Sequence, residues 1–209
     1  MYIPEAFRVD KPAALFEFIE RYNFATIVSA GAKADATHLP FLLDIERGER
    51  GTLLAHFARA NPHWKTFSSG GEALVIFQGP HCYLSPSWYP NQVTVPTWAY
   101  AAVHVRGPVR LLEKPSEVYP IVERLVQVQV HEHSWDLANA EPRMDQLLKM
   151  IVGFEIEIKS IEGKFKFNQN TAPADQRGVI DALSGSSDQN ERAVAAIMTD
   201  NLARASQAP

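Results

Sequence analysis

The stretch from Ala55 to Arg106 restricts the fold of this chain most, because it mixes aromatic rings, prolines and small polar residues. It holds three of the four tryptophans together with histidines and cations: Trp64, Trp88, Trp98, His56, His63, His81, His104, Arg59, Lys65 and Arg106. A hydrophobic core does not need this mixture, because every buried polar tip must find a partner. A site for a flat, polar, anionic ligand does need it, since rings stack on the ligand, hydroxyls and amides orient it, and cations neutralise it.

Length and composition narrow the class of protein. A chain of 209 residues suits one large domain, or one domain with a helical appendage. Hydrophobic residues make up 46% and charged residues 21%, so a packed core is expected. The net charge of −4 argues against broad electrostatic capture of DNA, which relies on clustered lysine and arginine.

The single cysteine and the N-terminal sequence predict the cellular compartment of the protein. Cys82 is the only cysteine, so no internal disulfide can form and a reducing cytoplasm fits. The first eight residues include proline, glutamate and arginine, which is not typical of a signal peptide. No apolar run approaches the roughly 18 residues that a membrane-spanning helix needs. We predict a cytoplasmic protein without membrane contact.

Hydrophobic spacing predicts a mainly β fold with helices. Strands are predicted over Phe24–Ser29, Thr37–Asp44, Thr52–Phe57, Ala73–Phe77, Cys82–Leu84 and Trp98–Leu112, and around the alternating Phe154, Ile156 and Ile158. Helices are predicted after Asp10, over Asn61–Phe67, from Ser116, over Met144–Ile151, and after a capping box of Asp188 and Glu191. Thr37–Asp44 and Thr52–Phe57 are expected to pair as a hairpin. About seven strands suggest a barrel with helical decoration (α+β), with one domain over 1–183 and a helical tail over 184–209.

Six segments resemble, in order, the characteristic sequences of the PaiB family: MYIPEAF, ATHLPFLLD, HFARANPHWK, YLSPSWYP, VPTWAYAAVHVRG and GFEIEIKSIEGKFKFNQN. The resemblance extends from Met1 to about Leu183. PaiB proteins are described as FMN-binding negative transcriptional regulators with the FMN-binding split-barrel fold. The resemblance therefore implies FMN as cofactor, a split β-barrel, and a homodimer that holds flavin in clefts along the subunit interface.

The phosphate of FMN is expected at a corner between a strand and a helix. The family-matched residues there are Arg59, Asn61, Trp64 and Lys65. Free N–H groups at a helix start favour an anion, and arginine and lysine add charge. The alternative is a solvated helix start with ordinary surface charges.

The resemblance implies three further groups of flavin contacts. Thr37, His38 and Leu39 lie on the strand expected beside the isoalloxazine ring, although His38 could instead be an interior histidine. Ser85, Trp88, Thr97, Trp98 and Tyr100 lie in the aromatic loop and the strand after it, where the alternative is a dimer interface. Lys164, Lys166, Gln169 and Asn170 are expected to approach flavin from a partner subunit, or to be a solvated strand end.

The sequence supports three functions to different degrees. The leading interpretation is a homodimeric FMN-binding protein of the PaiB type that regulates transcription negatively, through DNA or a regulatory protein partner. The alternatives are a flavin-dependent oxidoreductase acting on a small substrate, or a haem-binding protein of the same fold with His38, His56, His81 or His104 as ligand. No residue stands out as a catalytic acid or base, and no metal site is predicted.

Overall fold

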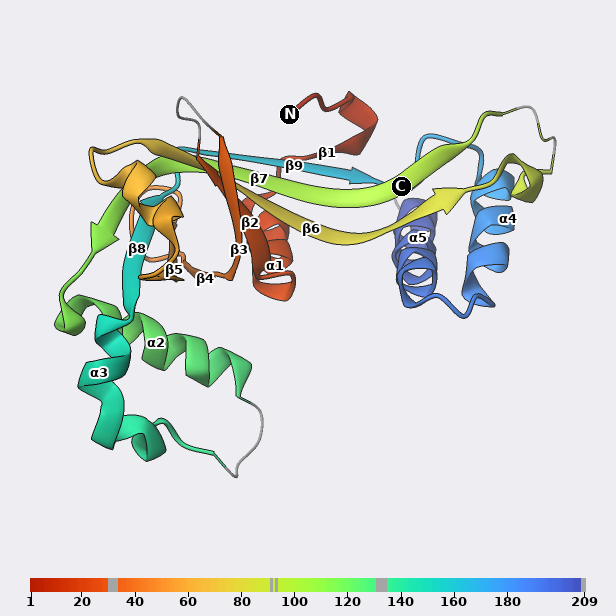
Figure 1. The fold of residues 1–209 in the computed structure, drawn as a ribbon. Helices are drawn as coiled ribbons and strands as arrows, with labels where there is room; N and C mark the ends of the chain where they lie inside the picture. The colour runs from red at the N-terminus through yellow and green to blue at the C-terminus, as the bar shows by residue number, and fades with distance from the viewer. Residues whose placement is uncertain (30–33, 91, 93, 131–134, 208–209) are drawn as a thin grey trace. The chain divides into compact units, whose positions relative to one another are not determined.

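The computed structural model describes residues 1–207 apart from residues 30–33, 91, 93 and 131–134. It is an α+β fold built on antiparallel strands with several helices (Figure 1). The chain divides into two compact units. The first unit comprises residues 1–12, 78–103 and 162–209, and the second comprises residues 13–77 and 104–161. The predicted boundary between residues 183 and 184 stays a prediction.

The second unit contains most of the sheet. Its strands are β2 (Phe24–Ser29), β3 (Asp35–Pro40), β4 (Leu42–Asp44), β5 (Thr52–Ala58), β8 (Ile151–Glu157), and parts of β6 (Glu72–Leu84) and β7 (Thr97–Leu112). Neighbouring strands follow the order β3-β2-β6-β7-β8-β5-β4. Among the described residues no pairing joins β3 to β4, so the sheet is not closed.

The predicted strand over Thr37–Asp44 is wrong in one respect, because it is two strands with different partners. β4 pairs with β5 as the predicted hairpin, whereas β3 pairs with β2. The break falls at Pro40, which has no N–H to donate, and Phe41, whose N–H donates to the Asn23 carbonyl at 2.9 Å. The Phe41 ring is buried against Phe77 and Phe154, with ring centroids 5.7 and 5.9 Å away. Burial of this ring holds the chain in the turn between the two strands.

The predicted interruption of the next strand at Gly79-Pro80 is also wrong. β6 runs without a break from Glu72 to Leu84, and both Gly79 and Pro80 are buried within it. The fixed φ of proline lies within the extended region, so Pro80 can continue the strand direction although it cannot donate to a neighbour. The long strand predicted over Trp98–Leu112 is confirmed as β7.

Helices cover part of the sheet in the second unit. They are α1 (Pro12–Arg21), α2 (Pro115–Gln129), α3 (Met144–Lys149), and the 3-10 helices η2 (Pro62–Phe67) and η4 (Leu137–Arg143). The buried face of α2 carries Val118, Ile121 and Leu125, as its spacing predicted. It packs in a cluster with Leu42, Leu54, Leu112 and Leu148, so strands and helices share this core. Figure 1 shows α2 and α3 beside β8.

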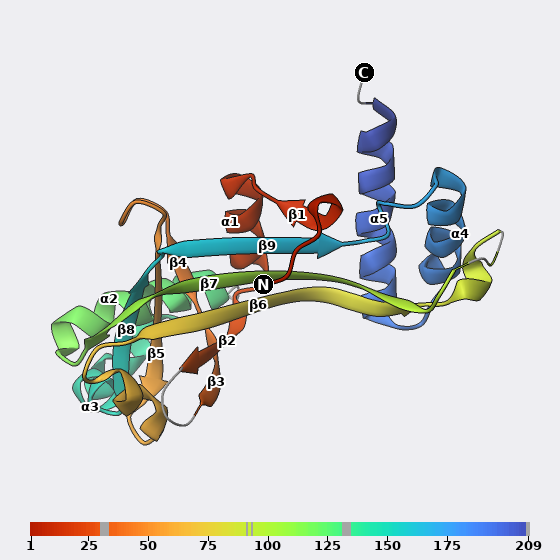
Figure 2. The same ribbon diagram turned by 90° about the horizontal axis from the view of Figure 1, so that it is seen from above.

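The first unit combines the other halves of β6 and β7 with two short strands and two helices. Its remaining elements are η1 (Glu5–Phe7), β1 (Arg8–Val9), η3 (Pro86–Trp88), β9 (Ser160–Lys166), α4 (Pro173–Ser184) and α5 (Gln189–Gln207). β9 pairs with β1 and β7. α4 and α5 pack side by side (Figure 2) and bury Val179, Leu183, Val194 and Met198.

The start of α5 confirms part of the predicted cap. The Asp188 carboxylate accepts from the N–H groups of Asn190 at 2.7 Å and Glu191 at 3.3 Å. The buried Cys82 thiol lies near this helix start. Burial first, and then the carboxylates of Glu191 and Asp188, raise the pKa of this thiol to about 12. None of the helices in the described ranges combines the length and the apolar composition needed to cross a membrane.

Candidate functional site

In the second unit, a hydrogen-bond network joins the predicted residues Thr37 and Asn61. Asn61 is the N-cap of η2, where its Oδ1 accepts from the His63 N–H at 3.0 Å. Its Nδ2 donates to Thr37 Oγ1 at 3.1 Å, and the same hydroxyl shares a hydrogen bond of 2.8 Å with His63 Nδ1. The network fixes the middle of β3 against the start of η2.

His63 completes this network, although the sequence analysis did not place it in the site. Its side chain is 1% exposed, and its ring lies 5.4 Å from Phe57 and 5.5 Å from Phe67. Burial lowers the pKa of the imidazole, with a smaller opposing effect from Asp35. His63 is thus held neutral as a support for Thr37. The signal was available in the sequence, since an Asn-Pro-His run places an N-cap two residues before a histidine.

The Arg59 guanidinium group donates hydrogen bonds to acceptors within the protein. Its Nε donates to the Lys149 carbonyl at 2.8 Å, its Nη2 to the Ile151 carbonyl at 3.0 Å, and its Nη1 to Glu113 at 3.2 Å. Each guanidinium nitrogen therefore has a protein acceptor, and the side chain ties the corner before η2 to the segment between α3 and β8. That the corner binds phosphate stays a prediction.

The other two predicted residues of this corner are Trp64 and Lys65, and the Trp64 indole lies close to both Lys65 and Arg59. Trp64 Nε1 donates to the Arg59 carbonyl at 3.0 Å. The Trp64 ring centroid lies 6.0 Å from Arg59 Cζ and 5.8 Å from Lys65 Nζ, so cations flank the ring. Lys65 itself is exposed.

His38 is exposed, which excludes its interpretation as an interior histidine. It shares a hydrogen bond of 2.9 Å with Thr26 on the neighbouring strand, and its ring stacks on Phe24 with centroids 6.4 Å apart. Leu39 is half-buried opposite Ala25. The predicted residues of β3 therefore differ in surroundings: Thr37 joins the network with Asn61, whereas His38 lies on the outer surface of β2 and β3.

In the first unit, β6 and β7 bring aromatic rings together on one face, which we call the aromatic face: His81, Tyr83, Trp98 and Tyr100. The Trp98 ring centroid lies 6.4 Å from His81 and 6.4 Å from Tyr83. Trp98 is 54% exposed and Tyr83 is 41% exposed. Large rings that stay this open are available for a planar ligand or a second protein chain.

Two lysines of β9 lie beside predicted residues of β7. Lys164 Nζ donates to the Tyr2 carbonyl at 3.2 Å and lies 5.3 Å from the Tyr100 ring centroid. Lys166 Nζ donates to the Thr97 hydroxyl. Burial lowers the pKa of Lys166; nearby Lys164 also lowers it, whereas Tyr100 raises it. The structure thus brings Thr97, Tyr100, Lys164 and Lys166 together, and it adds Tyr2 to them.

The other predicted residues of the first unit have local roles. Gln169 folds back on its own segment, accepting from the Phe167 N–H at 2.7 Å and donating to the Phe165 carbonyl at 2.6 Å. Ser85 caps η3, accepting from the Ser87 N–H at 3.3 Å. Trp88 is half-buried in η3, and Asn170 is exposed.

A buried pair in this unit joins Tyr89 of the aromatic loop to Asn168, which was not among the predicted residues. The Tyr89 hydroxyl donates to Asn168 Oδ1 at 3.0 Å. Burial raises the pKa of Tyr89, Asp175 raises it further, and the contact with the Asn168 side chain opposes them. Asn168 adopts a positive φ of 62°, which asparagine tolerates better than most residues. The pair fixes the chain where β9 ends.

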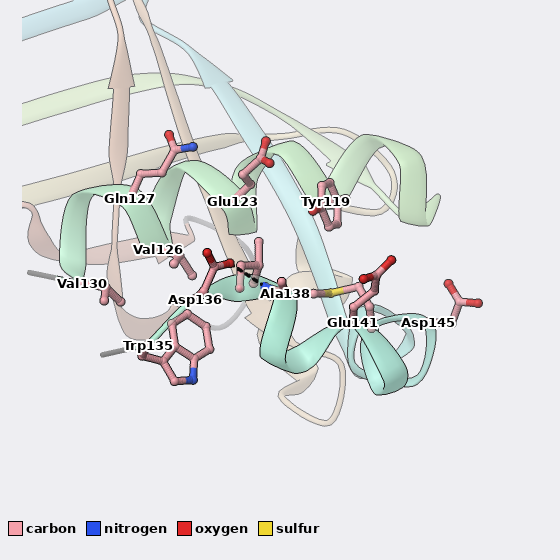
Figure 3. A pocket seen from close by; sticks show the side chains of 12 residues that line it. Tyr119, Glu123, Val126, Gln127, Val130, Trp135, Asp136, Ala138, Glu141 and Asp145 are labelled. Atoms are coloured by element: carbon pink, nitrogen blue, oxygen red, sulfur yellow. Dashed lines mark hydrogen bonds between the residues drawn. The ribbon is translucent and has the colours of Figure 1, made fainter. Parts of the chain in front are cut away.

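A cavity of about 930 Å³ opens in the second unit, and none of the predicted residues is among those that line it (Figure 3). It is lined by α2, η4, the start of α3 and the chain before η4: Tyr119, Glu123, Val126, Gln127, Val130, Trp135, Asp136, Leu137, Ala138, Glu141, Met144 and Asp145. Its four acidic side chains give it the wrong charge for the phosphate of FMN.

Comparison with known proteins identifies one family and several similar folds. Residues 1–160 match the family model described as "Putative FMN-binding domain". The Bacillus subtilis protein named protease synthase and sporulation protein PAI 2 is 35% identical over 206 residues, covering 97% of this chain and 98% of that protein.

Two solved structures share the fold at low sequence identity. The flavocytochrome Anf3 of Azotobacter vinelandii has a TM-score of 0.61 and 10% identity, covering 90% of this chain and 75% of that chain. An FAD- and haem-binding protein of Mycobacterium smegmatis has a TM-score of 0.55 and 12% identity, covering 80% and 78%. These likenesses confirm the predicted fold class.

Proposed function

Since this chain belongs to the family of FMN-binding proteins of the PaiB type, we propose that it acts as a homodimeric flavoprotein that regulates transcription negatively. FMN is the cofactor of the family. The residues of the first unit that we assign to flavin are Thr97, Trp98, Tyr100 and Lys164. Their arrangement supports the assignment, because the rings of Trp98 and Tyr100 lie within the region that the family model covers, and Lys164, just beyond that region, lies beside Tyr100 with neutral partners.

The observation that carries this proposal is the aromatic face. An isoalloxazine ring system is planar and apolar on both sides, so it stacks on exposed indole and phenol rings. Open aromatic surface of this kind is costly in water, which favours covering it with a ligand, with a second subunit, or with both. The same face therefore supports both flavin binding and assembly.

We expect the purified protein to bind added FMN and to be a dimer in dilute solution. Binding would appear as a change in the visible flavin absorption and as quenching of flavin fluorescence. Light scattering should return twice the chain mass of 23.3 kDa. A monomer mass at micromolar concentration would contradict the dimer, and an unchanged flavin spectrum would contradict the cofactor assignment. A Soret band after addition of haem, without any response to FMN, would favour the haem-binding alternative.

The regulatory part of the proposal requires selective contacts, because the charge of the chain does not favour DNA in general. At a net charge of −4, non-specific attraction to phosphates is weak. We expect weak or undetectable binding to a random duplex at moderate salt, measured by fluorescence anisotropy. Regulation would then act through a specific operator or through a protein partner. Tight, sequence-independent binding to DNA would show that this expectation about the charge distribution is wrong.

A further inference from the structure

We propose that Lys164 and Lys166 form a binding site for a phosphate monoester group, with Thr97 as its neutral hydrogen-bonding partner. The inference rests on the proposed FMN function and adds to it the residues that take the anionic group. FMN carries such a group, and so do other nucleotides. The two lysines occupy alternate positions of β9, so their side chains leave the strand on the same face.

Lys164 is buried although it carries a charge. Its side chain is only 9% exposed, although a buried ammonium group normally requires a counter-charge. The partners that it has are neutral: the Tyr2 carbonyl, and the rings of Tyr2 and Tyr100 at 5.6 and 5.3 Å. A carbonyl and two π faces offset only part of the lost hydration.

The neighbouring charge has the same sign. Lys166 donates to the Thr97 hydroxyl, a neutral group. Over the described ranges, no ion pair forms between a carboxylate and either Lys164 or Lys166. The nearest acid on the same face of β9, Glu162, pairs with the Met1 amino group at 3.0 Å. Two partly desolvated ammonium groups side by side repel each other, and an anion between them removes that repulsion.

The two lysines and Thr97 indicate the chemical class of the anion. Two cations at alternate positions of one strand match a dianion better than a single carboxylate. The Thr97 hydroxyl and the lysine N–H groups can donate charge-assisted hydrogen bonds to several oxygens at once. A phosphate monoester supplies both the charge and the oxygens. Arg59 is less suited to this role, because each of its nitrogens already has an acceptor.

The test uses Lys166→Met and Lys164→Met, which keep an apolar stem of similar length but remove the charge. We expect each to weaken FMN binding by about tenfold to a hundredfold, the range for losing a charge-assisted hydrogen bond. Riboflavin, which lacks the phosphate, should bind both variants nearly as well as it binds the unmodified protein. Without flavin, the variants should melt at an equal or higher temperature, because an unpaired buried charge has been removed.

Lys159→Met is the matched control, since Lys159 is exposed and already pairs with Glu157 at 2.6 Å. It should leave the affinities for FMN and riboflavin unchanged. If Lys164→Met and Lys166→Met lose equal affinity for FMN and riboflavin, these lysines support the ring or the fold. If their affinity for FMN is unchanged, these lysines do not bind its phosphate. Either result would overturn the inference.

Inorganic phosphate and AMP separate this inference from the proposed function. Millimolar amounts of either should raise the melting temperature of the unmodified protein but not that of the Lys164→Met, Lys166→Met double variant. If the unmodified protein binds neither flavin yet shows this response, the flavin function fails and the phosphate site stands. If phosphate and AMP leave the melting temperature unchanged while FMN binds, the phosphate site fails and the flavin function stands.

Discussion

An alanine at position 107 is expected to destabilise the second unit by about 3 kcal/mol or more, at the upper end of overpacking effects. A Cβ atom at Gly107 would lie 2.0 Å from the Glu157 carbonyl oxygen and 3.0 Å from the Glu157 carbonyl carbon. Both of these atoms belong to the backbone, so no side chain can rotate away to make room. The variant must instead separate β7 from the end of β8, whose register pairs Val109 with Ile156. Urea unfolding followed by circular dichroism measures the loss.

Gly153→Ala is the control for Gly107→Ala, because its added Cβ makes longer contacts. Its Cβ would meet the Val118 side chain at 3.1 Å and the Leu112 Cβ at 3.4 Å. The Val118 side chain can shift by a few tenths of an ångström, so this variant should lose clearly less stability than Gly107→Ala. Equal stabilities for the two variants would mean that β7 and β8 separate easily, and the close-approach argument would be wrong.

Gly178→Ala is expected to destabilise the first unit by about 1–3 kcal/mol, against the trend for alanine in helices. Gly178 lies inside α4, where alanine normally stabilises a helix by about 1 kcal/mol. Its Cβ would, however, lie 2.2 Å from the Trp88 carbonyl oxygen in η3. The helix must therefore move away from η3, which also carries the predicted flavin contact Trp88. Thermal unfolding measures the sign of the change, and FMN titration measures its effect on the site.

Gly185→Ala is the control that measures the effect of replacing glycine by alanine where the new Cβ makes no contact. Gly185 follows α4 with φ −87°, and a Cβ there meets nothing within 4 Å. This variant should be neutral or slightly stabilising. If Gly178→Ala proved as stable as Gly185→Ala, the contact between α4 and η3 would have to be looser than the structure gives.

Local patterns predicted much of the fold. Phe154 and Ile156 alternate with glutamates, and β8 buries them as that alternation requires. β2 has the predicted bounds. Helix α4 was not predicted, because only Gln176, Val179 and Leu183 of its twelve residues are buried and its apolar face is weak. The division of β3 from β4 has a local signal in Pro40, which lacks an N–H, but the burial of the Phe41 ring against distant rings is not visible in any local pattern.

The sequence indicated which residue types lie together in the candidate site, but not which atoms each side chain contacts. The aromatic and basic residues of the first unit lie together as their composition suggested, with Lys164 beside Tyr100. The acceptors of Arg59 could not be foreseen, because they are the backbone carbonyls of Lys149 and Ile151, far away in the sequence. Every residue has a backbone carbonyl, so the residue type does not show which carbonyls accept these hydrogen bonds. The protein partners of a cation at a helix start are therefore not visible in the residue types around it.

The burial of Cys82 limits how this protein can respond to oxidation. The chain has one cysteine, and burial raises the pKa of its thiol to about 12, so the thiol stays protonated at neutral pH. Oxidants and disulfides react with the thiolate, so the folded first unit makes this thiol a slow reactant. Thiol chemistry at Cys82 is therefore a poor route for a redox signal. The isoalloxazine of bound FMN takes up electrons without covalent modification of the chain, which makes it the better suited group.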